Sequence, residues 1–242
     1  LATIEGMLDT LVASEGEPDL VQLSGGEPTI HPQFFEILEA VKRRPIRHVM
    51  INTNGVRIAQ DREFVARLAS HAPRLEVYVQ FDSPDDDALV NVRGAKLSHI
   101  RQQAVENLEA VGLSTTLVAV VKKGINDREV PSLIQHALKW SCVRGVTLQP
   151  VQDAGRNDGF DGKTNRILPS ELRRLVAKSG VFTLDDMIPL PCNPDQICIG
   201  YGLRQGSTVT PITSLLPRDL ILQGPNTISY EAYPALRDGI LN

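Results

Sequence analysis

Two short polar segments contain residue types that could bind a small charged ligand. In the first, Gly25 and Gly26 let the backbone turn sharply and bring N–H groups close to a ligand. Glu27 follows, and Pro28 restricts the backbone beside it. A carboxylate here suits a cationic group, such as the ammonium of an amino acid. The alternative is a tight turn whose Glu27 faces solvent.

The second segment, residues 52–55, offers amides and a hydroxyl, which both donate and accept hydrogen bonds and suit sugar hydroxyls. A turn initiated by its Asn-Gly pair is the alternative. Gln80 and Asp82 bracket Phe81 further along, and the alternation along a strand predicts that both point to the same side. Because buried polar groups without partners are costly, this pattern favours a ligand or a polar network.

Five apolar segments alternate with amphipathic helical stretches, and polar or glycine-rich residues follow each of them. This alternation predicts a parallel sheet covered by helices, with the carboxyl ends of the strands forming one binding rim. Helices are also predicted over residues 3–13 and 169–178, and the run Asp85-Asp86-Asp87 is expected to open a helix or a turn after Pro84. The predicted strands are Leu20–Leu23, Ile46–Ile51, Leu75–Phe81, Ser114–Val121 and Gly145–Gln149.

Composition and charge exclude several classes of protein. The 242 residues are 42% hydrophobic and 22% charged, as in an ordinary globular protein. The net charge of −4 disfavours nucleic-acid binding through phosphate neutralisation. No apolar run approaches the about 18–20 residues that a membrane span needs. Three cysteines are too few for a disulfide scaffold, so a cytoplasmic location is the default expectation.

The regular alternation breaks after Pro150. A polar loop follows, and glycine and proline are frequent from Pro189 onward. We therefore expect a core domain over residues 1–180 and a Gly/Pro-rich extension over residues 181–242 that packs on it.

Taken together and in this order, the polar segments resemble those of radical S-adenosylmethionine (SAM) enzymes. The resemblance runs from about residue 20 to about residue 150, with spacing like that of the family. Leu190–Asp195 further resembles a subgroup with lipid- or pterin-modifying members. The matching motifs are Gly-Gly-Glu-Pro at 25–28, Asn-Thr-Asn-Gly at 52–55, Gln-Phe-Asp at 80–82, Arg93-Gly94 and Lys-Gly-Ile-Asn-Asp at 123–127.

The resemblance implies a partial (β/α)6 TIM-like barrel whose first strand and cluster loop are missing. It implies an oxidoreductase or transferase in which SAM and a [4Fe–4S] cluster generate a 5′-deoxyadenosyl radical that abstracts hydrogen from a substrate. The substrate would be a small molecule or a lipid, and the electron donor a flavodoxin or ferredoxin. Gly25, Gly26 and Glu27 would hold the methionine ammonium of SAM. The other implied SAM-binding residues are Pro28, Asn52, Thr53, Asn54, Gln80, Asp82, Asn126 and Gln149.

The sequence departs from the family at the cluster. Three cysteines spaced C-x3-C-x2-C should hold it after the first strand, and this triplet is absent. We expect the triplet upstream of Leu1, so that these residues alone would be inactive. The alternatives are a cluster-less SAM-binding or regulatory domain, and a non-radical barrel lyase using Lys122 or Lys123 at a strand end.

Cys192 and Cys198 form a C-x5-C pair in the extension. They are either ligands of an auxiliary iron–sulfur cluster or buried thiols in a loop that closes the barrel. The stiffening prolines around them predict that residues 190–201 pack near the carboxyl-end rim.

Overall fold

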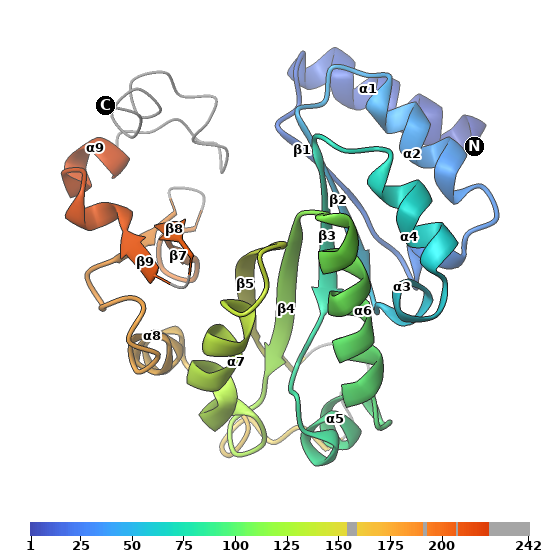
Figure 1. Ribbon diagram of the computed structural model, residues 1–242. Helices are drawn as coiled ribbons and strands as arrows, with labels where there is room; N and C mark the ends of the chain where they lie inside the picture. The colour runs from blue at the N-terminus through green and yellow to red at the C-terminus, as the bar shows by residue number, and fades with distance from the viewer. Residues whose placement is uncertain (154–158, 191–192, 207, 223–242) are drawn as a thin grey trace. The chain divides into compact units, whose positions relative to one another are not determined.

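The computed structural model describes residues 1–153, 159–190, 193–206 and 208–222. They divide into two compact units, and Figure 1 shows the helices and strands of both. Unit 1 comprises residues 1–120 and 140–149, and unit 2 comprises residues 121–139 and the part after 149. The predicted domain boundary at residue 180 stays a prediction. No described helix is both long and apolar enough to cross a membrane.

Unit 1 is built on a five-stranded sheet in the sequential order β1-β2-β3-β4-β5, with parallel pairing from β1 to β4. The helices α2, α4 and α6 run alongside these strands (Figure 1). Unit 1 contains α1 (Ala2–Glu15), β1 (Leu20–Leu23), the 3₁₀ turn η1 (Pro28–Ile30), α2 (Phe34–Lys42), β2 (His48–Thr53), α3 (Val56–Gln60), α4 (Arg62–Ala69), β3 (Leu75–Gln80), α5 (Asp86–Arg93), α6 (Ser98–Val111) and all but the last residue of β4 (Thr115–Val121) and of β5 (Val143–Pro150).

The sheet of unit 1 has one apolar face and one polar face. Val77 and Val79 of β3 are fully buried, and a side chain at Gly55 would meet Val79 and Ala104 of α6, so this face packs on the helices. The alternate residues of β3, Glu76 and Tyr78 among them, therefore point to the opposite side, here called the open face. At the carboxyl ends of the strands, polar side chains on the open face can contact a ligand.

Local capping explains where several elements begin and end. The Asp85 carboxylate accepts a hydrogen bond from the Asp87 backbone at the start of α5, which confirms that this acidic run opens a helix. Asp61 caps α4 in the same way through Phe64. Gly112 ends α6 in the left-handed conformation, with φ 64°, that glycine adopts at little cost.

Unit 2 consists of helices and short antiparallel strand pairs. Ile188, Ile212, Leu216 and Ile221 form a small apolar cluster in it. The sequence predicted little periodicity in this region, whereas the structure pairs β6 with β7 and β8 with β9. Unit 2 contains η2 (Asp127–Glu129), α7 (Val130–Ala137), α8 (Pro169–Ala177), β6 (Met187–Pro189), β7 (Cys198–Gly200), β8 (Gly202–Gln205), β9 (Thr208–Pro211), η3 (Ile212–Ser214) and α9 (Arg218–Leu222).

Candidate functional site

The Glu27 carboxylate links the loop after β1 to the end of β2. Its Oε1 accepts hydrogen bonds from the Thr29 backbone at 3.2 Å, the Thr29 hydroxyl at 2.6 Å and the Thr53 hydroxyl at 2.6 Å. Its Oε2 accepts from the Asn54 backbone at 2.7 Å. A carboxylate fixed by four donors stays in place when a ligand arrives, and Oε2 keeps capacity for a further donor.

Gly25 and Gly26 lie next to this fixed carboxylate. A side chain built at either glycine would meet no atom within 4 Å. The loop therefore leaves open space beside Glu27, and its backbone groups can approach a ligand closely. Pro28 starts η1, and Thr29 behind it is fully buried.

Thr53 and Asn54 hold the turn that follows β2. The Thr53 hydroxyl accepts from the Gly55 backbone at 3.1 Å while it donates to Glu27. The Asn54 side-chain oxygen accepts from the Val56 backbone at 2.9 Å, at the start of α3. These two side chains thus position the rim, and the predicted turn is present, whereas the role of this segment in binding a ligand stays a prediction.

Asp82 is bound within the chain on both of its oxygens. Arg93 donates to it from Nε at 2.6 Å and from Nη2 at 2.7 Å, and the Val120 backbone donates at 2.9 Å. The Asp82 side chain is fully buried. This bidentate pair holds the end of β3 against α5 and β4, which is the polar network that the Gln-Phe-Asp pattern allowed.

Arg101 on α6 is a charged residue that the sequence interpretation missed. It is 1% exposed, and its Nε and Nη1 atoms have no hydrogen-bond partner among the described residues. Burial lowers its pKa, the Asp82 and Glu27 carboxylates oppose that shift, and Arg93 adds to it. Arg101 therefore contributes positive charge to Asp82 and Glu27 and has donors left unsatisfied.

A sequence signal for Arg101 did exist. Arg101 stands at helical spacing with the buried residues Ala104, Val105 and Leu108, so it shares their face of α6. An arginine within an apolar stripe marks a buried charge that needs an explanation.

The amide side chains of Asn52, Gln80 and Gln149 lie on the open face. Asn52 is in register with Tyr78, which places it on the same side as Gln80. Gly145 faces the Thr116 hydroxyl, and by alternation Gln149 points to that side as well. Unlike Asp82, whose two oxygens are bound within the chain, these amides stand where a ligand could use them.

Asn126 belongs to unit 2, whereas the rim residues described above belong to unit 1. Its side-chain oxygen accepts from the Lys122 backbone at 2.8 Å, and the residue is 2% exposed. It therefore shapes the turn after β4.

The cysteines do not form a metal site within the described ranges. Cys142 is buried, and burial together with the Glu109 carboxylate raises its pKa to about 12, which keeps the thiol protonated. Cys198 is half-buried in β7, and burial raises its pKa as well. Cys192 lies outside the described residues, so an auxiliary cluster at Cys192 and Cys198 stays a prediction. No group of three or more His, Cys, Asp or Glu that could hold a metal ion occurs in the described part of the chain.

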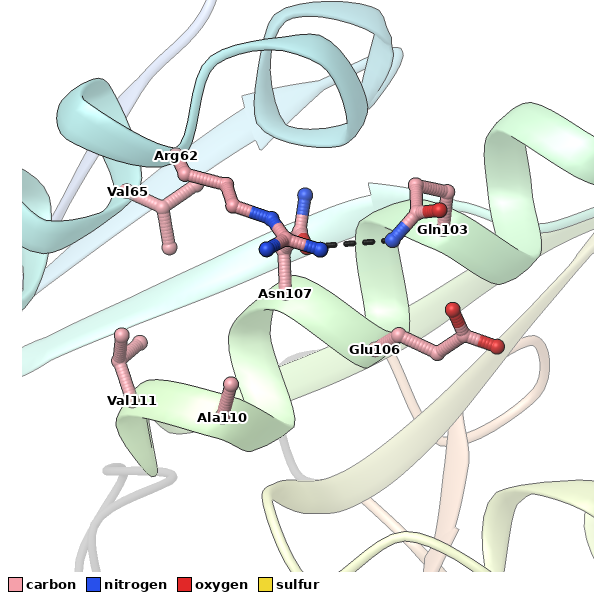
Figure 2. A pocket seen from close by; sticks show the side chains of 7 residues that line it. All are labelled: Arg62, Val65, Gln103, Glu106, Asn107, Ala110 and Val111. Atoms are coloured by element: carbon pink, nitrogen blue, oxygen red, sulfur yellow. Dashed lines mark hydrogen bonds between the residues drawn. The ribbon is translucent and has the colours of Figure 1, made fainter.

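A hollow of about 240 Å³ lies elsewhere in unit 1, on the outer helical layer between α4 and α6 (Figure 2). Arg62, Gln103 and Glu106 line it together with Val65 and Val111. The Gln103 amide is engaged with Asn107 at 3.2 Å, and no carboxylate of the rim reaches this place. We therefore place the candidate site at the rim and not in this hollow.

The class of protein follows from the sheet and its rim: an α/β protein of the barrel type. A fixed carboxylate, a glycine loop and open amides lie at the carboxyl ends of its strands, where proteins of this class bind ligands. The family model described as the radical SAM superfamily matches residues 1–137, and the chain belongs to that superfamily. The predicted fold class, an α/β partial TIM-like barrel, is confirmed by the parallel sheet and by the structural neighbours.

Known relatives are enzymes of this superfamily. The chain is 30% identical over 192 residues to the 7,8-dihydro-6-hydroxymethylpterin dimethyltransferase of Methanocaldococcus jannaschii, covering 78% of this chain and 38% of that protein. It is 26% identical over 172 residues to the GTP 3′,8-cyclase of Mesorhizobium japonicum, covering 69% of this chain and 49% of that protein. The chain thus spans less than half the length of these relatives.

A solved structure, "Native anSMEcpe with bound AdoMet", aligns over 76% of this chain and 50% of its own chain. The TM-score is 0.52 at 16% sequence identity. This similarity concerns the fold.

Proposed function

We propose that this chain is the SAM-binding part of a radical SAM enzyme that acts on a small-molecule substrate. The observation that carries the proposal is the Glu27 carboxylate, which is held by four hydrogen bonds beside an open Gly25-Gly26 loop. Superfamily membership over residues 1–137 supports it.

The residues present fit SAM. The methionine ammonium would lie at Glu27 Oε2, with backbone groups of Gly25 and Gly26 around it. Asn52 and Gln80 have amides on the open face that suit the ribose hydroxyls, and Gln149 extends this set. Thr53, Asn54 and Asp82 act by fixing the rim through their contacts within the chain.

The positive charge of Arg101 would compensate the negative charges of the carboxylates at this rim. SAM carries a carboxylate in addition to its ammonium, and the unsatisfied guanidinium donors of Arg101 lie near Glu27 and Asp82. A buried positive charge lowers the energy of anionic groups placed close to it, because the surrounding dielectric is low. Arg101 is therefore a positioning residue for the carboxylates of the site.

In this superfamily, SAM and a [4Fe–4S] cluster together supply a 5′-deoxyadenosyl radical that abstracts hydrogen from the substrate. The described residues provide no cysteine set for the cluster, so its binding and the electron donor, a flavodoxin or ferredoxin, are proposals for the whole protein. A SAM-binding domain that works without a cluster is the second candidate function. The fixed Glu27 carboxylate beside the open glycine loop supports it equally, because this feature concerns SAM and not the cluster.

We propose a fused nitrogen heterocycle as the substrate class. The two relatives above are named for a pterin and for GTP, which both contain such a ring system.

Calorimetric titration of the chain with SAM tests the proposal, with 5′-methylthioadenosine as the comparison because it lacks the amino-acid part. We expect SAM to bind roughly tenfold or more tightly than 5′-methylthioadenosine, because the charge-assisted bond to Glu27 is lost in the latter. Equal affinities would reject the role of the Glu27 loop. Anaerobic reconstitution of the full-length gene product with iron and sulfide, followed by an assay for 5′-deoxyadenosine, separates the two candidates.

A further inference from the structure

A second polar group lies on the open face, deeper in the sheet than the rim amides. We call His48, Glu76, Tyr78, Thr116 and Thr147 the floor cluster. The register pairs Tyr78 of β3 with Thr116 of β4, and His48 and Glu76 occupy the amino-terminal halves of β2 and β3. The cluster thus crosses four neighbouring strands, β2 to β5, on the side away from the helices.

Glu76 is the centre of the floor cluster. Its Oε1 accepts from the Thr116 hydroxyl at 2.5 Å, and its Oε2 contacts His48 Nε2 at 3.2 Å. The Glu76 side chain is 14% exposed and the His48 side chain 33%. Each carboxylate oxygen has two lone-pair directions, so each keeps one for a further donor.

The neighbours of Glu76 are arranged around it with little freedom. A side chain at Gly145 would come within 2.8 Å of the Thr116 hydroxyl, so glycine leaves this hydroxyl room to reach Glu76. Burial raises the pKa of Tyr78, against the opposing effect of the Thr147 and Thr116 side chains, and this keeps the Tyr78 hydroxyl neutral. The hydroxyls and the carboxylate are therefore oriented before any ligand binds.

This polarity is unusual for the interior face of a barrel sheet, which branched apolar side chains commonly fill. A partly buried carboxylate is costly unless it gains hydrogen bonds or an opposite charge. Thr116 and His48 already offset part of this cost, and a ligand that supplies donors to the two remaining lone pairs would offset more of it. The floor cluster is better suited to recognition than to packing.

The charges on this face narrow the chemistry of the ligand. Along the described strands β1 to β5, no position that alternates onto the open face is lysine or arginine. A phosphate or carboxylate group would find no lysine or arginine here, whereas Glu76 offers two adjacent acceptor atoms. Two neighbouring N–H donors on a flat ring match these acceptors.

We infer that the floor cluster binds the 2-aminopyrimidinone edge of a fused nitrogen heterocycle, with a ring N–H and the adjacent amino group donating to Glu76. This inference rests on the proposed function and specifies how its substrate is held. The rim residues Asn52 and Gln80 lie four positions beyond His48 and Glu76, or about 13 Å along the strands. A substrate held at Glu76 can therefore extend towards a SAM molecule at the rim.

Guanosine and inosine test the inference, because inosine lacks only the 2-amino group. Their affinities for the chain are measured by calorimetry with saturating SAM present, for the wild type, Glu76→Gln and the control Glu15→Gln. Glu15 is exposed at the end of α1. Thermal unfolding and SAM affinity of each variant report whether the fold and the rim are intact.

We expect the wild type to bind guanosine roughly tenfold more tightly than inosine, and Glu76→Gln to lose this preference while its SAM affinity stays unchanged. The control keeps the preference. Equal binding of the two nucleosides by the wild type, no binding of either, or an unchanged preference in folded Glu76→Gln would each overturn the inference. The wild-type comparison needs no variant and stands even if Glu76→Gln fails to fold. Absence of SAM binding contradicts the proposed function separately.

Discussion

Replacing Glu27 by glutamine is expected to lower both stability and SAM affinity. Glutamine keeps one oxygen and places an NH2 group where the other stood, so at least one of the four donors on Glu27 faces another donor. Hydrogen bonds to a charged group contribute about 1.5–3 kcal/mol and those between neutral groups about 0.5–1.5 kcal/mol. The difference is about 1 kcal/mol per bond, or about 4 kcal/mol for four bonds as an upper limit. Because Glu27 is only half-buried, we expect a loss of about 2 kcal/mol in the free energy of unfolding.

Thermal unfolding followed by circular dichroism measures this effect. For a chain of this size, about 2 kcal/mol corresponds to a fall of about 4–8 °C in the unfolding midpoint. The control Glu15→Gln should leave the midpoint unchanged. If Glu27→Gln unfolds at the same temperature as the control, the carboxylate does not anchor the loop. A lower unfolding midpoint with unchanged SAM affinity would show that the Glu27 carboxylate stabilises the fold but does not bind SAM.

Three further changes probe the same region and its supports. Arg101→Met should change the unfolding midpoint little, because replacing a buried charge by an apolar group is often neutral, but it should weaken SAM binding in calorimetry. Gly55→Ala should lower the free energy of unfolding by about 1–2 kcal/mol or more, because φ at this position is 75° and the new methyl group would lie 3.2 Å from Val79. A chemical denaturation midpoint equal to that of the wild type would contradict this. Hydrogen bonds from Ser141 lower the pKa of Glu109 from 4.5 to about 2, so its stabilising effect is present above pH 4.5 and is lost as the pH falls through about 2. Glu109→Gln should remove this part of the acid unfolding profile, and an identical profile would show that Glu109 is not its source.

The sheet could be predicted from the sequence because its signal is local. Runs of valine, isoleucine and leucine about 30 residues apart indicated the strands, and the structure places β1 at Leu20–Leu23 as predicted and the others within a few residues of their predicted ends. The short strands β6 to β9 were not predicted. They have three or four residues each, contain glycine and proline, and depend on pairing partners rather than on their own periodicity.

The partners within the site could not be predicted, because they join residues far apart in sequence. Glu27 and Thr53 are 26 residues apart, and Asp82 and Val120 are 38 apart. The sequence identified Glu27 and Asp82 as polar residues at strand ends, but their donors are known only once the strands are aligned. Arg101 was overlooked because Ile100 beside it completed an apolar stripe equally well on a helical pattern.

Solution NMR of the isotope-labelled chain, titrated with SAM, tests the central claim most directly. Binding at the rim should produce the largest shifts at the backbone amides of Gly25 and Gly26 and at the side-chain amides of Asn52 and Gln80. Shifts confined to the hollow between α4 and α6, or no SAM-dependent shift at the Gly25-Gly26 loop, would contradict the account.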